Sequence, residues 1–180
     1  LVEQRAHGGG VLDAARDDGG AVAAPLVLLP LAGWCARLWS GADVEFRTLT
    51  VRMTMGLAPI GFAMWLVHML FHFFTSWGTV VPAVQRVFED LGTTFLGEPI
   101  WAMSCCGPMP PWLLPLEILL LDLGLLLTLF VQYRIARQYV SGAWRELRLV
   151  LPWCIVSIAL FILGIWIIFQ PMQMRGTLLP

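Results

Sequence analysis

The stretch VLPWCIVSIALFILGIWIIFQ, from Val150 to Gln170, decides the fold class of this chain because it contains no charged residue. The hydrocarbon layer of a bilayer is about 30 Å thick and an α-helix rises about 1.5 Å per residue, so about 20 apolar residues cross it. The stretch has that length. It therefore predicts a membrane-spanning helix.

Three further apolar stretches extend this prediction to a bundle. Residues 55–77 carry no Asp, Glu, Lys or Arg, and residues 111–133 are rich in leucine. Residues 21–39 form the weakest stretch because Pro25 and Pro30 interrupt it. None of the four stretches alternates apolar and polar residues as the strands of a membrane barrel do. The sequence predicts an all-α fold, an integral membrane helical bundle with three to four transmembrane helices.

The composition of the whole chain agrees with a lipid environment. Of its 180 residues, 58% are hydrophobic and 13% are charged, and the mean hydropathy is +0.77. A soluble protein of this size could not bury so much apolar surface. The net charge of -1 argues against the concentrated basic surface that nucleic acid needs. The expected partner is therefore the lipid bilayer, and no nucleic acid is expected.

The chain divides by composition into three parts. Residues 1–20 form a polar N-terminal linker, residues 21–177 form the helical membrane domain with an outer loop over 78–110, and residues 178–180 are a tail. The opening stretch lacks the basic start and apolar core of a signal peptide. Because the first residue is also not Met, we expect a fragment, the C-terminal part of a longer protein; the alternative is a non-standard start codon.

The arginines predict how the domain is oriented, because short loops rich in Arg stay cytoplasmic. Four arginines are spread over the linker, the outer loop and the segment after the last predicted span: Arg5, Arg16, Arg86 and Arg175. Seven fall in two connections on the opposite side: Arg37, Arg47, Arg52, Arg134, Arg137, Arg145 and Arg148. Both termini and the loop 78–110 are therefore predicted outside. The interfacial tryptophans would be Trp77 and Trp112 outside, and Trp39, Trp144 and Trp153 inside.

The outer loop is predicted to contain one amphipathic helix. Its first part, VVPAVQRVFEDLG, has Pro82 near the start and Gly92 as a stop. Its apolar residues follow helical spacing: Val84, Val87, Phe88 and Leu91. Such a helix lies on the membrane surface or against a partner, or it packs over the bundle.

Two histidines lie within the second predicted span. His68 and His72 are four residues apart, so they share one face of the helix. Ionisable side chains inside a membrane cost free energy and often have a function. Two histidines on adjacent turns cannot bind opposite faces of one porphyrin, so a haem held by this chain alone is not expected. A haem shared with another segment or subunit stays open.

Two carboxyl groups lie within the third predicted span. Counted from the outer tryptophans, Glu117 lies at the depth of His72, and Asp122 lies near the depth of His68. The two acids are about 140° apart around the helix, so at most one of them points straight at the histidine helix. We predict a proton or redox relay of His68, His72, Glu117 and Asp122 at a quinone or other redox site. The alternative is that neighbouring helices simply satisfy each group.

The outer loop also contains a run of sulfur side chains, in the segment WAMSCCGPMPPW. Thiolates and thioethers are ligands that favour Cu(I), so Met103, Cys105, Cys106 and Met109 are a candidate copper site. The adjacent cysteines could instead form a disulfide with each other or with another subunit, and the methionines could be packing residues. Cys35 and Cys154, which stand alone, are expected to be packing residues.

Three segments resemble the C-terminal membrane part of bacterial membrane-bound polyferredoxins, which are accessory 4Fe-4S iron-sulfur proteins of respiratory chains. The segments are LAPIGFAMWLVHMLFHFFTSWGTVVPAVQR, SCCGPMPPWLLPLEILLLDLGLLLTLFVQYRIAR and FILGIWIIFQPMQMRGT, and the resemblance covers Val51 to Thr177. The cluster-binding motif of that family, C-x-x-C-x-x-C-x-x-x-C-P, does not occur in this chain. The resemblance therefore implies 4Fe-4S clusters only upstream of Leu1, with no cluster ligand in this chain.

The resemblance implies a function in electron transport. We expect the membrane-embedded part of an iron-sulfur electron-transfer protein in a bacterial inner membrane, a component rather than a stand-alone enzyme, whose partner is a membrane redox protein or a quinone. Two alternatives stay open: a copper-handling or oxidase-assembly protein that uses the outer Met and Cys residues, and a structural anchor of a respiratory complex.

Overall fold

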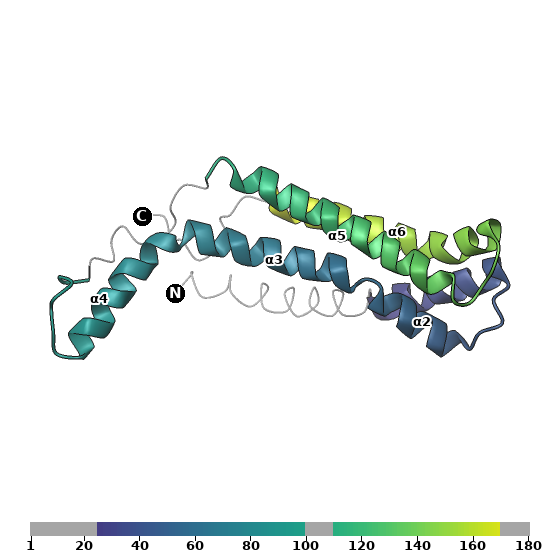
Figure 1. The fold of residues 1–180 in the computed structure, drawn as a ribbon, viewed down its shortest axis with the longest axis horizontal. Helices are drawn as coiled ribbons and strands as arrows, with labels where there is room; N and C mark the ends of the chain where they lie inside the picture. Colours follow the sequence, from purple (N-terminus) through teal and green to yellow (C-terminus); the bar gives the residue numbers. More distant parts are fainter. Residues whose placement is uncertain (1–24, 100–109, 170–180) are drawn as a thin grey trace, which may run out of the picture. The chain divides into compact units, whose positions relative to one another are not determined.

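A computed structural model describes residues 25–99 and 110–169, which form helices and contain no strand. The first helix covers residues 25–40. The others are α2 (Phe46–Met55), α3 (Ala58–Thr75), the short 3-10 helix η2 (Trp77–Thr79), α4 (Val80–Asp90), α5 (Leu113–Ala136) and α6 (Ala143–Ile168), as Figure 1 shows. The predicted all-α helical bundle is confirmed.

Three helical segments are long and apolar enough to cross a membrane: Phe46–Thr75, Leu113–Ala136 and Ala143–Ile168. They contain most of the predicted spans 55–77, 111–133 and 150–170. The last segment begins seven residues earlier than predicted, because a polar turn with Arg145 and Glu146 continues the helix toward its N-terminus. The predicted first stretch, 21–39, is helical from residue 25, and its start lies outside the described residues.

The connection before the second predicted span is itself helical and forms α2. Its buried residues Leu49 and Met53 are one helical turn apart. The α-helical hydrogen-bond pattern is interrupted between α2 and α3, where the Leu57 amide donates to the Thr54 carbonyl oxygen at 2.9 Å. Pro59 has no amide hydrogen and so cannot bond back to Met55, which favours a break at this place.

The described residues divide into two compact units. Among the described residues, unit 1 comprises 25–58 and Thr128–Ile158, and its core joins the first helix, α2, the end of α5 and the start of α6. Arg145 ties two of these elements together, because its guanidinium donates to the carbonyl oxygens of Ser40 (3.1 Å) and Gly41 (3.0 Å). Trp153 is 0% exposed in this core, so its side chain packs against protein, and its predicted place at the inner interface stays a prediction.

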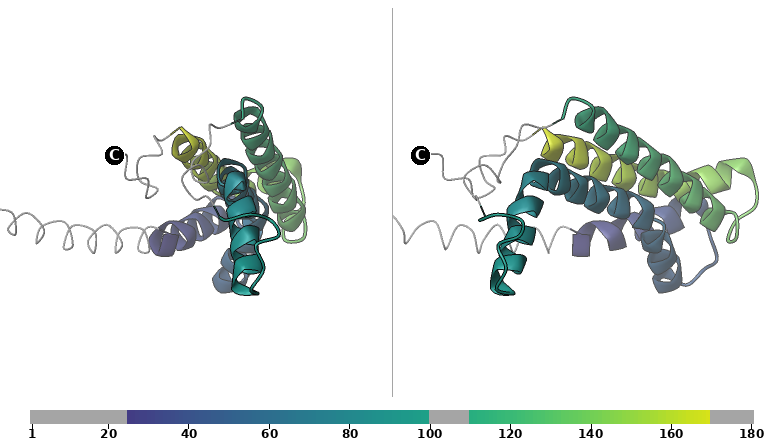
Figure 2. Two further views of the ribbon diagram at one scale, coloured as in Figure 1. Left: turned by 90° about the vertical axis from the view of Figure 1, so that its left-hand side faces the viewer. Right: turned by 60° about the vertical axis from the view of Figure 1, so that its left-hand side comes forward.

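Among the described residues, unit 2 comprises 59–99, 110–127 and 159–169, and it holds most of α3, all of α4, the first part of α5 and the end of α6. Ala63, Val67 and Leu121 form its core. A β-carbon at Gly124 would lie 2.5 Å from that of Ala63, so only glycine allows α5 to approach α3 this closely. The parts of α3, α5 and α6 in unit 2 pack side by side, as the right-hand view of Figure 2 shows.

Helix α4 confirms the amphipathic helix that was predicted in the outer loop. Its apolar residues Val84 and Val87 are exposed. On its polar side Arg86 forms ion pairs with Glu89 and Asp90, each at 3.2 Å. Within unit 2, α4 turns away from the direction of α3 after η2 (Figure 1). Its apolar face is therefore open to a membrane surface or to a partner.

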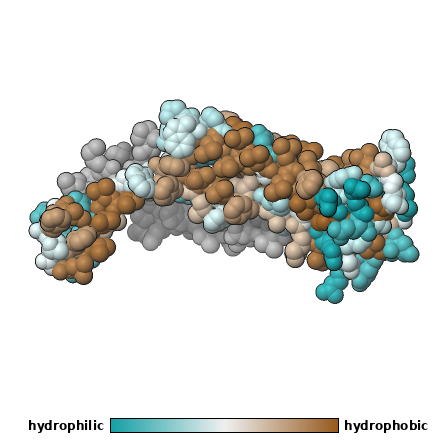
Figure 3. Space-filling model, viewed as in Figure 1, coloured by the Kyte–Doolittle hydropathy of each residue, from teal (hydrophilic) through white to brown (hydrophobic). Residues whose placement is uncertain are grey.

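Helix α5 distributes its residues in the opposite way from a helix of a soluble protein. Three polar residues lie in its buried stripe, namely Glu117, Thr128 and Gln132. The exposed positions are almost all apolar: Leu119, Leu123, Leu126, Leu127 and Phe130. Hydrophobic residues cover much of the surface over α3 and α5 in Figure 3. Such a surface suits lipid as its solvent.

Candidate functional site

The two histidines lie on one side of α3, within unit 2. His68 is exposed and His72 is half-buried. Their ring centroids are 4.6 Å apart, with the rings at 78° to each other. The spacing of four residues therefore brings the two imidazoles into contact, as the sequence predicted. Rings in contact leave no room between them for a porphyrin, so the pair does not fit a haem with both histidines as axial ligands.

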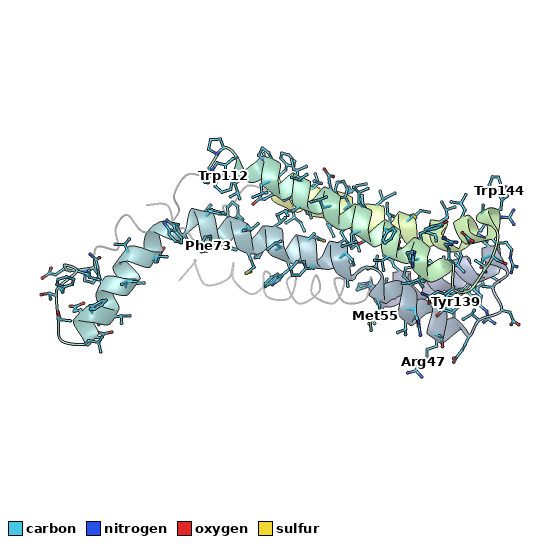
Figure 4. All side chains as sticks on the ribbon, viewed as in Figure 1. Arg47, Met55, Phe73, Trp112, Tyr139 and Trp144 are labelled. Carbon is cyan, nitrogen blue, oxygen red and sulfur yellow. The ribbon has the colours of Figure 1, made fainter. Side chains whose placement is uncertain are left out.

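Two contacts fix how α3 and α5 are aligned along their lengths. Near the start of α5, the ring centroids of Trp112 and Phe74 are 4.7 Å apart, and Figure 4 labels Trp112 there. Further along, Gly124 packs against Ala63. The two helices run antiparallel, because residue numbers fall along α3 while they rise along α5.

This alignment places Glu117 at the level of the histidines. Glu117 lies five residues after Trp112 and seven residues before Gly124. The same distances counted along α3 from Phe74 and Ala63 set Glu117 opposite Met69 and Leu70, between His68 and His72. Its side chain belongs to the buried stripe of α5 and is only 2% exposed. A carboxyl group and an imidazole pair are thus held at one level in unit 2.

Asp122 lies elsewhere. It follows the buried Leu121 by one residue, which turns it about 100° around α5, and its side chain is exposed. The structure therefore separates the two acids of the predicted relay, with Glu117 inside unit 2 and Asp122 on its surface. A relay through Asp122 stays a prediction.

Within residues 25–99 and 110–169, no three His, Cys, Asp or Glu side chains come together to hold a metal ion. The described cysteines, Cys35 and Cys154, are both half-buried, and Cys154 packs against the core of unit 1. The candidate copper ligands Met103, Cys105, Cys106 and Met109 lie outside the described residues.

A second group of buried polar side chains, which the sequence did not predict, lies in unit 1. Ser157 Oγ donates its proton toward Gln132 Oε1 at 3.2 Å and the carbonyl oxygen of Trp153 at 2.8 Å. The donors Gln132 Nε2 and Trp153 Nε1 have no hydrogen-bond partner among the described residues, and neither has Thr50 Oγ1. A single amide or hydroxyl in a leucine-rich stretch gives too weak a sequence signal to identify such a group.

A groove of about 600 Å³ also lies in unit 1. It runs between the first helix and the region where α2 gives way to α3, and Leu26, Leu29, Val51 and Met55 are among the residues that line it. Among its described lining residues, Thr50 and Thr54 carry the hydroxyl groups. The sequence does not predict this groove, because the groove depends on how two helices pack.

No protein-family model matches the chain, and no curated protein or solved structure is significantly similar to it. The resemblance to polyferredoxins thus stays a prediction from sequence.

Proposed function

We propose that this chain is the membrane-embedded part of an electron-transfer protein and that His68, His72 and Glu117 exchange protons with a quinone. The observation that carries the proposal is the burial of Glu117 at the level of the two histidines in unit 2. Ionisable groups inside a membrane are costly, and where they gather they usually serve ion or proton transfer.

The chemistry of a quinone suits this set of side chains. Reduction to the quinol adds two electrons and two protons, and each proton must reach a carbonyl oxygen inside the membrane. An imidazole both accepts and donates a proton near neutral pH, and a carboxyl group can do the same in turn. His72 and Glu117 therefore supply the protons, and a partner iron-sulfur electron carrier supplies the electrons.

The proposal includes an orientation in a bacterial inner membrane. The arginine distribution supports an outer side that holds α4, η2 and the start of α5, and an inner side that holds the turn between α5 and α6. His72 and Glu117 then lie about 8 Å below the outer tryptophans, a depth that a quinone ring dissolved in lipid can reach.

A photoreactive azidoquinone tests the site. The chain is reconstituted into phospholipid nanodiscs, labelled under light, and analysed by peptide mass spectrometry. We expect labels within 58–75 or 113–127 that an excess of unreactive quinone suppresses. His72→Asn and Glu117→Gln should each reduce labelling about tenfold, the effect of losing one charge-assisted hydrogen bond.

Asp122→Asn is the matched control, because it makes the same chemical change on an exposed face of the same helix. It should leave the labelling unchanged. Labelling that neither His72→Asn nor Glu117→Gln reduces, or that falls only in unit 1, would contradict the proposal. The chain would then be better explained as a structural anchor.

A further inference from the structure

Asp122 occupies a position that lipid alone does not explain. It lies ten residues after Trp112, or about 15 Å along the helix, which is close to the middle of a 30 Å hydrocarbon layer. Its neighbours on the exposed face of α5 are leucines, with Leu119 53% and Leu126 63% exposed. A carboxyl group among lipid-facing leucines at this depth costs free energy.

The described part of the chain places no arginine near Asp122. The ion pairs among the described residues all lie within α4, where Arg86 pairs with Glu89 and Asp90. Along α5 the next basic residue is Arg134, twelve residues or about 18 Å away. The parts of α3 and α6 in unit 2 contain no arginine. Asp122 therefore makes neither a hydrogen bond nor an ion pair with the described residues.

We propose that the Asp122 face of α5 docks a transmembrane helix of another protein that carries an Arg or Lys side chain at the same depth. A cation on that helix would neutralise the carboxylate, and the surrounding leucines would pack against its apolar residues. A second copy of this chain fits less well, because the arginines of its described spans lie near their ends rather than at this depth. The proposal does not rest on the proposed function, which uses the buried stripe of the same helix.

Synthetic leucine-based transmembrane peptides serve as the probe. One peptide carries a single Arg at the depth of Asp122, a second carries Arg two turns away, and a third carries only Leu. Energy transfer between a labelled peptide and the labelled chain in phosphatidylcholine vesicles measures their association. We expect the matched Arg peptide to associate about tenfold or more tightly than the Leu peptide, as for a polar contact between membrane helices.

Two variants make the test specific. Asp122→Leu should abolish the preference for the Arg peptide. Adding Leu119→Asp to Asp122→Leu moves the acid almost one turn toward the outer side, and the preferred depth of the Arg should move with it. Equal binding of all three peptides, or a preference that survives Asp122→Leu, would overturn the proposal. Self-association of the chain through Asp122 that the Arg peptide fails to displace would also overturn it.

Discussion

At the scale of single residues, the membrane domain keeps its polar side chains in the places where a soluble protein has apolar ones. Gln132 and Ser157 are both 0% exposed, and a hydrogen bond of 3.2 Å joins them. Gln132 Nε2 nevertheless finds no acceptor among the described residues. A buried donor without an acceptor costs about 1–3 kcal/mol, so this amide weakens the fold of unit 1 unless it has a role in binding.

Two substitutions of Gln132 test whether its unpaired amide weakens the fold of unit 1. Gln132→Met keeps the volume and removes the donor, so the thermal midpoint in detergent should stay the same or rise. Gln132→Ala leaves a cavity and should lower the midpoint by about 4 °C or more, which corresponds to about 2 kcal/mol. If both variants lower it equally, the amide has an acceptor and the account of unit 1 is wrong.

The sequence defined the residue types of the candidate site but not their surroundings. The helical angle between Glu117 and Asp122 showed that at most one of them faces α3, and the packing of Gly124 against Ala63 decides which one. Both acids follow leucine in the sequence, so local pattern cannot distinguish them. Trp153 shows the same limit, because a tryptophan near a span end suits either an interface or a core.

At the scale of elements, hydropathy predicted the three helices that are long and apolar enough to cross a membrane. It did not predict the short helix α2. Arg47 and Arg52 lower the hydropathy of α2, although Leu49 and Met53 have helical spacing and are buried. The amphipathic pattern of α4 was predicted correctly because its apolar residues recur every three or four positions. Close contacts between helices depend on small residues. The sequence around a single glycine does not show which residue of another helix packs against it.

Gly124 provides a test of the contact between α3 and α5. In Gly124→Ala the added carbon would meet Ala63, so the variant should be less stable by about 1–3 kcal/mol. Gly61→Ala is the matched control, because nothing lies within 4 Å of a β-carbon at Gly61. That variant should be as stable as the wild type or slightly more stable, since Ala favours a helix. Thermal unfolding in detergent measures both, and equal stability of the two variants would contradict the alignment of α3 and α5.

At the scale of the whole molecule, the account requires that the ends of the spanning helices lie on defined sides of the membrane. Glu89 in α4 belongs to the predicted outer side, and Gln138, after α5, belongs to the inner side. Both side chains are exposed, so a cysteine at either position can be labelled. The arginine distribution supports this orientation. The orientation can be tested directly by labelling these two positions.

Cysteine labelling in intact bacterial cells provides that check. With the four native cysteines changed to Ser, Glu89→Cys should react with a membrane-impermeant maleimide in intact cells. Gln138→Cys should react only after the cells are permeabilised. Labelling in the reverse order would invert the proposed orientation, and labelling of both positions in intact cells would show that α5 does not separate them.

The central claim is that Glu117 exchanges a proton when a quinone is reduced in the membrane. Infrared difference spectroscopy measures this most directly, on the reconstituted chain with bound quinone that is reduced and reoxidised at an electrode. The account predicts a carboxyl band that changes with the redox state, that disappears in Glu117→Gln, and that persists in Asp122→Asn. A spectrum that is identical in the wild type and in Glu117→Gln would contradict it.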